Sequence, residues 1–317
     1  MTNLMDLSGK KVIVTGGAGF IGSHIVDELI RLGAEVVVVD DLSTGRKENL
    51  AHNMDRIKFV QGSILNTDLM KEVFKGAFAV IHQAALPSVP KSIEFPMETK
   101  MANSVGTLSV FLAAREVGVD RVIYASSSSV YGNTPVLPKV ETMYPNPLSP
   151  YAVHKLTTEL YGRLFSSIYN LKTIGLRYFN IFGPRQNPKS LYAAVIPKFI
   201  STMHAGESPQ IFGDGEHTRD FTFVSNAVQA NIKSLFATEG FGEAFNIAAG
   251  SQISLNDLVG AINKALGTDH EPIYLPPREG DVKDSFADLS KAKKILGYDV
   301  LVPFEEGIKI TVESLIK

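Results

Sequence analysis

The feature that most constrains the fold of this chain is a glycine-rich turn close to its start. Residues 11–15 form a short β-branched run, and Gly16, Gly19 and Gly22 follow at three-residue intervals. Apolar residues then recur at helical spacing over 20–32. Glycine at such a turn permits a tight bend, approach of a ligand's phosphates to the backbone, and close contact of helix and strand. A strand that enters a helix in this way is typical of parallel α/β sheets.

The remainder of the first half repeats this alternation of strand and helix. A second helix is predicted over 105–117, with Leu108 and Leu112 on one face. Further short apolar runs predict strands over 35–40, 57–60, 79–82 and 121–125. Because strands that alternate with helices form βαβ units, we predict a Rossmann-type, doubly wound parallel sheet.

The second half is less regular and predicts a smaller α/β domain. Strands are predicted over 172–179 and 244–247, and helices over 195–204, 226–236 and 254–266. The predicted division is therefore a Rossmann domain over 1–180, to which a late strand near 244–248 returns, and a mainly substrate-binding domain over 181–317.

Composition and charge exclude several classes of function. The 317 residues contain 31 Lys and Arg against 33 Asp and Glu, a net charge of -2, which predicts neither nucleic acid nor a membrane surface as a partner. The absence of cysteine excludes disulfides and thiolate metal sites, and no metal site is predicted from the seven histidines. Without a long apolar run or a secretory signal pattern in the first ten residues, we expect a cytoplasmic protein.

A cofactor is indicated by the glycine turn together with Asp40, which ends the second predicted strand. Backbone N–H groups at the start of the helix, around Phe20 and Ile21, would face a pyrophosphate. A carboxylate at Asp40 would bind ribose hydroxyls and repel a 2′-phosphate, so NAD is favoured over NADP.

A reactive pair is predicted at Tyr151 and Lys155, four residues apart. Ser149 is a predicted N-cap and Pro150 a first helical residue, so both side chains share a face of the first two helical turns. We expect the ammonium and the helix N-terminus to lower the pKa of Tyr151 and make it a general base. Ser126, Ser127, Ser128 and Ser129 follow the fifth strand, where a doubly wound sheet binds its ligands.

Together these motifs resemble the extended short-chain dehydrogenase/reductase family, and within it the UDP-hexose 4-epimerases that act on UDP-glucose or UDP-N-acetylglucosamine. The resemblance covers nearly the whole chain. It lies in TGGAGFIGSH from Thr15, HQAA from His82, SSSSVYG at 126–132, YAVHK at 151–155, LRYFNIFGPR at 176–185, GDGEHTRDF at 213–221 and REGD at 278–281.

The resemblance implies roles for individual residues. Ser127 would hydrogen-bond the sugar 4-hydroxyl, Tyr151 would act as the base, and Lys155 would hold the nicotinamide ribose. The cofactor would also contact Ser63 and Ile64, where Ser63 replaces an aspartate that is frequent in the family. The implied substrate-binding residues are Ser88, Asn103, Ser127, Tyr151, Asn180, Val195, Arg219, Arg278, Asp281 and Ser285.

The resemblance also bears on the substrate and on the assembly. Ser285 falls where enzymes limited to UDP-glucose and UDP-galactose usually carry tyrosine, and a small residue leaves room for a 2-acetamido group. The implied substrates are therefore UDP-GlcNAc and UDP-GalNAc, alone or alongside UDP-glucose and UDP-galactose. A homodimer is implied, through the helix over 105–117 and the helix that carries Tyr151.

Three other interpretations remain open. A UDP-glucuronate 4-epimerase can carry SSSSVYG, although RYFN at 177–180 favours the neutral-sugar enzymes. A 4,6-dehydratase needs an acidic pair where this chain has Ser128 and Ser129. A catalytically silent nucleotide-binding protein of the same fold would have no need of Ser127, Tyr151 and Lys155 together.

Overall fold

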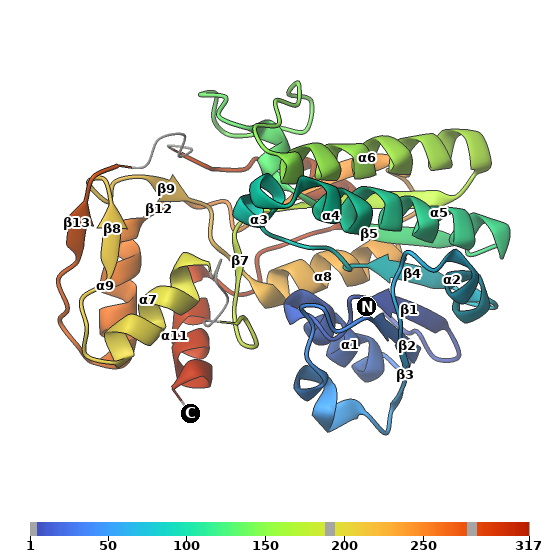
Figure 1. Cartoon of the computed structure of the whole chain (residues 1–317), viewed down its shortest axis with the longest axis horizontal. Coiled ribbons are helices and arrows are strands. Elements are labelled where there is room, and N and C mark those ends of the chain that lie inside the picture. Colours follow the sequence, from blue (N-terminus) through green and yellow to red (C-terminus); the bar gives the residue numbers. More distant parts are fainter. Residues whose placement is uncertain (1–4, 188–193, 278–283, 317) are drawn as a thin grey trace.

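A computed structural model describes residues 5–187, 194–277 and 284–316, in which a parallel sheet flanked by helices adjoins a smaller part (Figure 1). Within those residues the largest sheet has seven strands in the order β11-β6-β5-β4-β1-β2-β3, and all its pairs are parallel. Its strands are β1 (Lys11–Thr15), β2 (Glu35–Asp40), β3 (Ile57–Gln61), β4 (Ala79–His82), β5 (Arg121–Ser127), β6 (Lys172–Tyr178) and β11 (Glu243–Ile247). The predicted doubly wound sheet is confirmed.

Helices cover both faces of this sheet, which explains why its strands are apolar throughout. Val12 and Val14 of β1 pack into one buried cluster with α1 and α8, whereas Ile13 packs into the other with α2, α5 and α6. The helices are α1 (Phe20–Arg31) and α8 (Val224–Leu235) on one face, and α2 (Thr67–Phe74), α5 (Gly106–Glu116) and α6 (Pro150–Tyr169) on the other. Burial on both faces removes the alternating pattern of a half-exposed strand.

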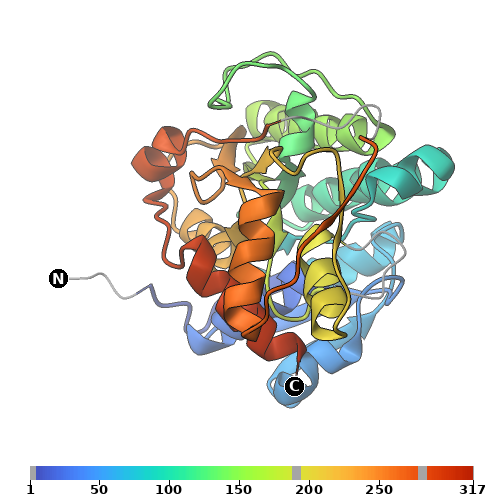
Figure 2. The same cartoon turned by 90° about the vertical axis from the view of Figure 1, so that its left-hand side faces the viewer.

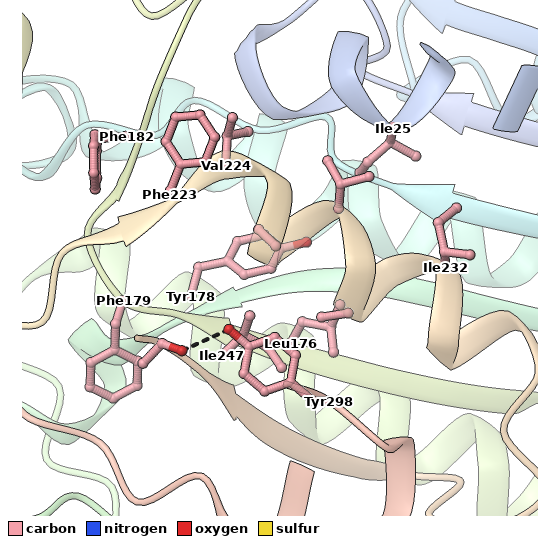
Figure 3. Close-up of a cluster of buried hydrophobic side chains, with 14 of the residues drawn as sticks. Ile25, Leu176, Tyr178, Phe179, Phe182, Phe223, Val224, Ile232, Ile247 and Tyr298 are labelled. Carbon is pink, nitrogen blue, oxygen red and sulfur yellow. Dashed lines mark hydrogen bonds between the residues drawn. The ribbon is translucent and has the colours of Figure 1, made fainter. Parts of the chain in front are cut away.

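The first of these clusters joins the sheet to the second half of the chain. Figure 3 shows Ile25 of α1 and Ile232 of α8 on the same side of the sheet as Leu176 of β6, with Ile247 of β11 and Tyr298 beside Leu176. The late strand β11 pairs with β6 at the edge of the sheet, and α8 packs against α1. Residues beyond 180 therefore complete the sheet and one of its helix layers.

The smaller part contains short strands between helices, and Figure 2 turns it towards the viewer. Its described strands form three two-stranded sheets, β10 with β7, β12 with β9 and β13 with β8. The strands are β7 (Ile181–Phe182), β8 (Gln210–Phe212), β9 (Thr218–Arg219), β10 (Thr222–Phe223), β12 (Ile253–Ser254) and β13 (Ile273–Leu275). The helices are α7 (Val195–His204), α9 (Leu255–Leu266), α10 (Ser290–Leu296) and α11 (Phe304–Leu315).

Several boundaries differ from the sequence predictions. The helix predicted from residue 105 begins at Gly106 and is preceded by a π-helical turn, η2 (Met101–Val105), and by α3 (Val89–Glu94) and α4 (Pro96–Lys100). The helix predicted from residue 226 begins at Val224. Two 3-10 helices, η1 (Lys47–Asn53) and η3 (Ser128–Tyr131), complete the elements that the structure describes. Proline at the first or second position of α3 and of α4 suits a helix start, a signal that was available in the sequence.

Candidate active site

The turn between β1 and α1 brings backbone atoms close together, so that side chains cannot be accommodated there. A Cβ at Gly16, whose φ is 70°, would lie 2.5 Å from the backbone nitrogen of Ala84. A Cβ at Gly22 would lie 2.1 Å from the carbonyl oxygen of Gly16. Gly19 is the N-cap of α1, and Phe20 and Ile21 form its first turn. The result is a shallow backbone cradle at a helix N-terminus, which favours a phosphate group.

The carboxylate of Asp40 lies at the end of β2, beside this turn. It accepts hydrogen bonds from the backbone N–H of Ala18 at 3.0 Å and of Leu42 at 2.8 Å. Burial raises the pKa of Asp40. A Cβ at Gly45 would lie 2.7 Å from Oδ1, so glycine is the residue that lets this loop pack against the carboxylate.

Ser63 and Ile64 follow β3 in the turn that precedes α2. The hydroxyl of Ser63 accepts from the N–H of Leu65 at 3.3 Å, and Ile64 is buried against Gly106 of α5. Their strand neighbours β2, which ends at Asp40. Both residues therefore lie on the same edge of the sheet as the glycine turn.

Ser127, Tyr151 and Lys155 come together at the carboxyl end of β5. Ser149 caps α6 by accepting from the N–H of Ala152 at 3.2 Å, so Tyr151 lies in the first turn of α6. Its side chain is hydrogen-bonded to Ser127. Lys155 Nζ lies 5.8 Å from the centre of the Tyr151 ring and donates to the carbonyl of Ala125 at 2.8 Å.

The expected lowering of the Tyr151 pKa is wrong for the chain by itself. Burial raises the pKa of Tyr151 to about 12, and the hydrogen bond from Ser127 only partly opposes this. Burial also lowers the pKa of Lys155 to about 8, and the negative charge of Glu159 acts in the opposite direction. Because both groups lose water, each is shifted towards its neutral form.

The four serines after β5 have different surroundings. Ser126 is buried and donates to Glu159 Oε1 at 2.5 Å. The hydroxyl of Ser127 accepts from the N–H of Ser129 at 3.2 Å and meets Tyr151. Of the four, Ser127 is therefore the serine that the structure brings to the tyrosine.

The amide of Asn103 binds the backbone of Leu86 through both of its ends. Its Oδ1 accepts from the Leu86 N–H at 2.7 Å, and its Nδ2 donates to the Leu86 carbonyl at 3.1 Å. Asn103 is buried in η2, one turn before Thr107. Its role here is to hold the loop after β4.

Buried His82 extends this arrangement into the sheet. The Thr107 hydroxyl donates to the carbonyl of Asn103 at 2.6 Å, so it must accept from His82 Nε2, 2.9 Å away. The other ring nitrogen then accepts from Thr15, the last residue of β1, at 2.7 Å. Burial lowers the pKa of His82 to about 3, so the ring is neutral.

Three of the predicted substrate residues gather around β9. Asn180 is exposed immediately before β7, with its Nδ2 3.5 Å from the carbonyl of Asp220. Arg219 is in β9, and its Nη1 donates to the carbonyl of Thr218 at 2.9 Å. The N–H of Ser285 donates to the same carbonyl at 3.2 Å.

Two other predicted residues lie in helices, and two fall outside the described residues. Ser88 caps α3 by accepting from the N–H of Lys91 at 3.1 Å, and α3 packs against α6. Val195 begins α7, which packs against α9. Arg278 and Asp281 lie outside the part of the chain that the structure describes.

Sequence reasoning missed Asp220 as an organising residue. This buried carboxylate accepts from the N–H groups of Ala249 at 2.9 Å, Gly250 at 3.2 Å and Ala287 at 3.3 Å. Burial raises its pKa to about 6 in spite of these bonds. Its place next to Arg219 in the quoted motif was the available signal.

A search of the described residues found no group of three or more histidine, aspartate or glutamate side chains that could hold a metal ion. In the same ranges, no helix has the length and apolar character needed to cross a membrane.

Comparison with known proteins connects this geometry to a family. The sequence model of the NAD dependent epimerase/dehydratase family matches residues 12–248. A UDP-glucose 4-epimerase of Mycolicibacterium smegmatis is 41% identical over 308 residues, which are 96% of this chain and 97% of that protein.

Two solved structures are similar over almost their full length. The UDP-glucose 4-epimerase of Thermotoga maritima, solved with UDP-glucose, has 41% identity and a TM-score of 0.92, and the match covers 96% of this chain and 98% of that one. The UDP-N-acetylglucosamine 4-epimerase of Methanobrevibacter ruminantium M1, in complex with UDP-N-acetylmuramic acid, has 40% identity and the same TM-score, with 98% and 99% covered.

Proposed function

Since the chain belongs to the NAD dependent epimerase/dehydratase family, we propose that it inverts the hydroxyl-bearing carbon C4 of UDP-hexoses. It is an NAD-dependent isomerase. The observation that carries the proposal is the meeting of Ser127, Tyr151 and Lys155 at the end of β5 in a chain 41% identical to a 4-epimerase over nearly its full length.

The residues of the first βαβ unit fit NAD. The glycine cradle at Gly16 and Gly22 has no space for side chains, and it lies at the positive end of α1. Asp40 would hold the adenosine ribose. Ser63 and Ile64 would lie near the adenine, and Lys155 near the nicotinamide ribose. When bound, NAD⁺ would supply a reversible hydride acceptor, which takes hydride from sugar C4 and gives it back to the opposite face of the resulting keto carbon.

Tyr151 handles the proton of the 4-hydroxyl. With a pKa of about 12 in the chain by itself, the Tyr151 hydroxyl stays protonated at neutral pH, so a positive charge beside it is required to favour the phenolate that acts as the base. Lys155 contributes one such charge below pH 8. Ser127 bridges the hydroxyl and the tyrosine, and Tyr151 returns the proton after the 4-keto sugar has turned over.

The nucleotide must stay bound while the sugar turns. We therefore assign the diphosphate to Asn180, Arg219 and Arg278, since arginine pairs with phosphate through two parallel bonds. Asp281 would bind the uridine ribose. Ser88, Val195 and Ser285 would line the space for the sugar, and Asn103 would act through the Leu86 backbone that it holds.

The small side chain of Ser285 favours UDP-GlcNAc and UDP-GalNAc as substrates, alongside UDP-glucose and UDP-galactose. Ser285→Tyr should abolish conversion of the acetylated pair while UDP-galactose is still converted, and Ser285→Ala is the matched control. Equal loss for both pairs, or no loss, would contradict the assignment.

We also propose a homodimer, on the evidence of an apolar surface across α5 and α6. Leu112 of α5 and Leu160, Leu164 and Ile168 of α6 are between 38% and 61% exposed. On α6 these residues share one face at helical spacing, and such a face is typical of a helix–helix interface. Leu164→Glu should convert the dimer to a monomer in analytical ultracentrifugation, whereas Leu301→Glu, at a leucine that is 60% exposed outside α5 and α6, should not.

The activity is tested by incubation with UDP-galactose, UDP-GalNAc and UDP-glucuronate separately, followed by chromatography of the products. Conversion of the first two supports the proposal, and conversion of UDP-glucuronate alone would replace it with the acidic-sugar reaction. Tyr151→Phe should reduce kcat by roughly 10³-fold, within the range expected for a general base. An inactive wild type that still binds NAD would favour the silent nucleotide-binding protein.

A further inference from the structure

A continuous chain of buried hydrogen bonds runs from the catalytic helix to the segment that contains Ser285. It begins at Glu159, one helical turn after Lys155 on α6. Glu159 accepts from Arg177 of β6 through both oxygens, at 2.8 Å from Nε and 2.7 Å from Nη2. Its Oε1 also accepts from Ser126, the neighbour of Ser127. The ion pair therefore joins α6, β5 and β6 beneath the proposed reaction centre.

The chain continues away from this pair through two neutral side chains. Arg177 Nη1 donates to the hydroxyl of Tyr131 at 2.8 Å, and that hydroxyl donates to Asn246 Oδ1 at 2.7 Å. Asn246 Nδ2 donates to the carbonyls of Lys139 at 2.9 Å and Asp288 at 3.2 Å. Arg177, Tyr131 and Asn246 are all at most 5% exposed, so solvent does not replace these bonds.

The polarity of the chain is fixed by the charge at its start. A guanidinium only donates, so the Tyr131 hydroxyl accepts from Arg177 and must point its own proton towards Asn246. The amide oxygen of Asn246 then faces Tyr131, and its NH₂ group faces the two carbonyls. Only one arrangement of donors and acceptors therefore satisfies every side chain in the series. Removal of the Tyr131 hydroxyl would leave both Arg177 and Asn246 without one hydrogen-bond partner.

The far end of the hydrogen-bond chain lies against a backbone segment that is also held at Ser285 by Thr218 and at Ala287 by Asp220. The Lys139 N–H donates to the carbonyl of Phe286 at 2.7 Å, and the Asp288 N–H donates to the carbonyl of Lys139 at 2.9 Å. The pairing of Lys139 with Ala287 is an isolated bridge outside the named strands. Asn246 thus holds both sides of the contact that follows Ser285.

We propose that Tyr131 and Asn246 are positioning residues that set the depth of the sugar pocket by fixing residues 286–288 to the Glu159–Arg177 pair. This inference rests on the proposed function, because it takes Ser285 as part of the pocket. The two residues act on the substrate through backbone that they hold, and they leave the glycine turn and Asp40 untouched.

The variant Tyr131→Phe tests the proposal, since it deletes one hydroxyl and retains the ring that packs against Phe179. Tyr298→Phe is the matched control. The Tyr298 hydroxyl is also buried, and it donates to the carbonyl of Ala248 at 2.7 Å, a bond that is not part of the hydrogen-bond chain described above (Figure 3). We expect Tyr131→Phe to raise KM for the UDP-sugar about tenfold, the effect of one lost hydrogen bond. We expect kcat to fall less than threefold and the Kd of NAD, from calorimetry, to stay within twofold. The control should change none of the three.

Amide hydrogen exchange gives a readout that does not depend on activity. In Tyr131→Phe the amides of Lys139 and Asp288 should exchange several times faster, and in Tyr298→Phe they should not. If the wild type turns over no UDP-sugar, the proposed function fails and the exchange rates alone decide whether the chain holds the segment. An active wild type with the same KM and exchange in both variants would overturn the proposal. If Tyr131→Phe does not fold, Asn246→Ser interrupts the hydrogen-bond chain one bond further along. It must then give the same changes in KM and in amide exchange.

Discussion

The seven-stranded sheet and the smaller part of the molecule satisfy their buried backbone groups in different ways. In the sheet, β1 pairs with β2 over five residues and with β4 over four, so ladders provide most partners. In the smaller part, strands of two or three residues provide few ladder bonds. There, buried Asp220 binds the backbone of distant segments instead, and Asn226 at the start of α8 holds the segment that precedes α11 in the same way.

This difference predicts which substitutions would destabilise each part. Backbone bonds in a ladder do not depend on side-chain identity, so the sheet tolerates substitution wherever volume is conserved. A segment held by one carboxylate or amide loses several bonds in a single substitution. Around the seven-stranded sheet, the most damaging substitutions should therefore be those that add volume at a close contact. In the smaller part, they should be those that remove a buried polar side chain.

The largest effect is expected for Gly22→Ala, which tests the steric side of the comparison. A methyl group there would lie 2.1 Å from the carbonyl oxygen of Gly16, so the turn must open. We expect the Kd of NAD in calorimetry to rise at least 100-fold. Gly260→Ala is the matched control, since it is also a helical glycine, in α9, but its methyl group would meet nothing within 4 Å. It should leave NAD binding unchanged and stabilise the protein by up to about 1 kcal/mol. Equal binding by both variants would contradict the steric account.

The same contrast explains how much could be predicted from sequence. Strands β1, β2 and β4 have the predicted bounds, because the periodicity of residues 11–15, 35–40 and 79–82 is local. Ser127, Tyr151 and Lys155 were found through a strand end and a four-residue spacing, and the structure brings them together.

What was missed depends on pairs far apart in the chain. The bond between Tyr131 and Asn246 spans 115 residues and has no periodic signature. The pairing of both ends of the Asn103 amide with the Leu86 backbone likewise has no signature in the sequence. The pKa of Tyr151 is higher than predicted for a related reason. Burial depends on the packed structure, whereas the spacing of residues shows only which side chains are neighbours on the helix.

A second prediction compares two asparagines that each hold a segment of backbone, Asn226 a segment of the smaller part and Asn103 the loop after β4. Asn226 accepts from the N–H groups of Leu301 at 2.9 Å and Val302 at 3.1 Å, and donates to the carbonyl of Val302 at 2.8 Å. Asn226→Ala should lower the free energy of unfolding by about 2–4 kcal/mol, since three backbone groups lose their partner. Asn103→Ala should cost about half as much, because Leu86 follows a strand that is held on both sides. Urea unfolding measures both, and a larger loss for Asn103→Ala would reverse the comparison.

A third prediction concerns how the contribution of Asp220 to the stability of the fold depends on pH. Its pKa is about 6 in the folded protein, against 3.8 for an aspartate side chain free in water, so the folded state binds more protons between these values. Stability therefore falls as pH rises from about 4 to about 6, by up to about 3 kcal/mol from this group. Asp220→Asn removes the titration, so the stability of the wild type minus that of the variant should decrease over this window in thermal unfolding. An increase would mean that the backbone N–H bonds outweigh burial.

The smallest effects are expected at two helix caps, and they test whether the contrast extends to helices. Ser254 caps α9 in a capping box with Asp257, in which each side chain accepts from the other's N–H, at 3.0 and 3.1 Å. The next residue, Leu255, donates its N–H to Gly215, so the cap also positions a loop of the smaller part. Ser254→Ala should cost about 1 kcal/mol, within the range for such caps.

Ser149→Ala removes the corresponding cap of α6, but that helix packs along β5, β6 and α5. Its loss in urea unfolding should therefore be smaller than that of Ser254→Ala. Since Tyr151 lies in the turn that the cap fixes, we expect Ser149→Ala to lower kcat in addition to causing this small loss of stability. If both variants lost the same stability at unchanged kcat, helix ends would be equivalent in the two parts, and the contrast would be confined to strands and loops.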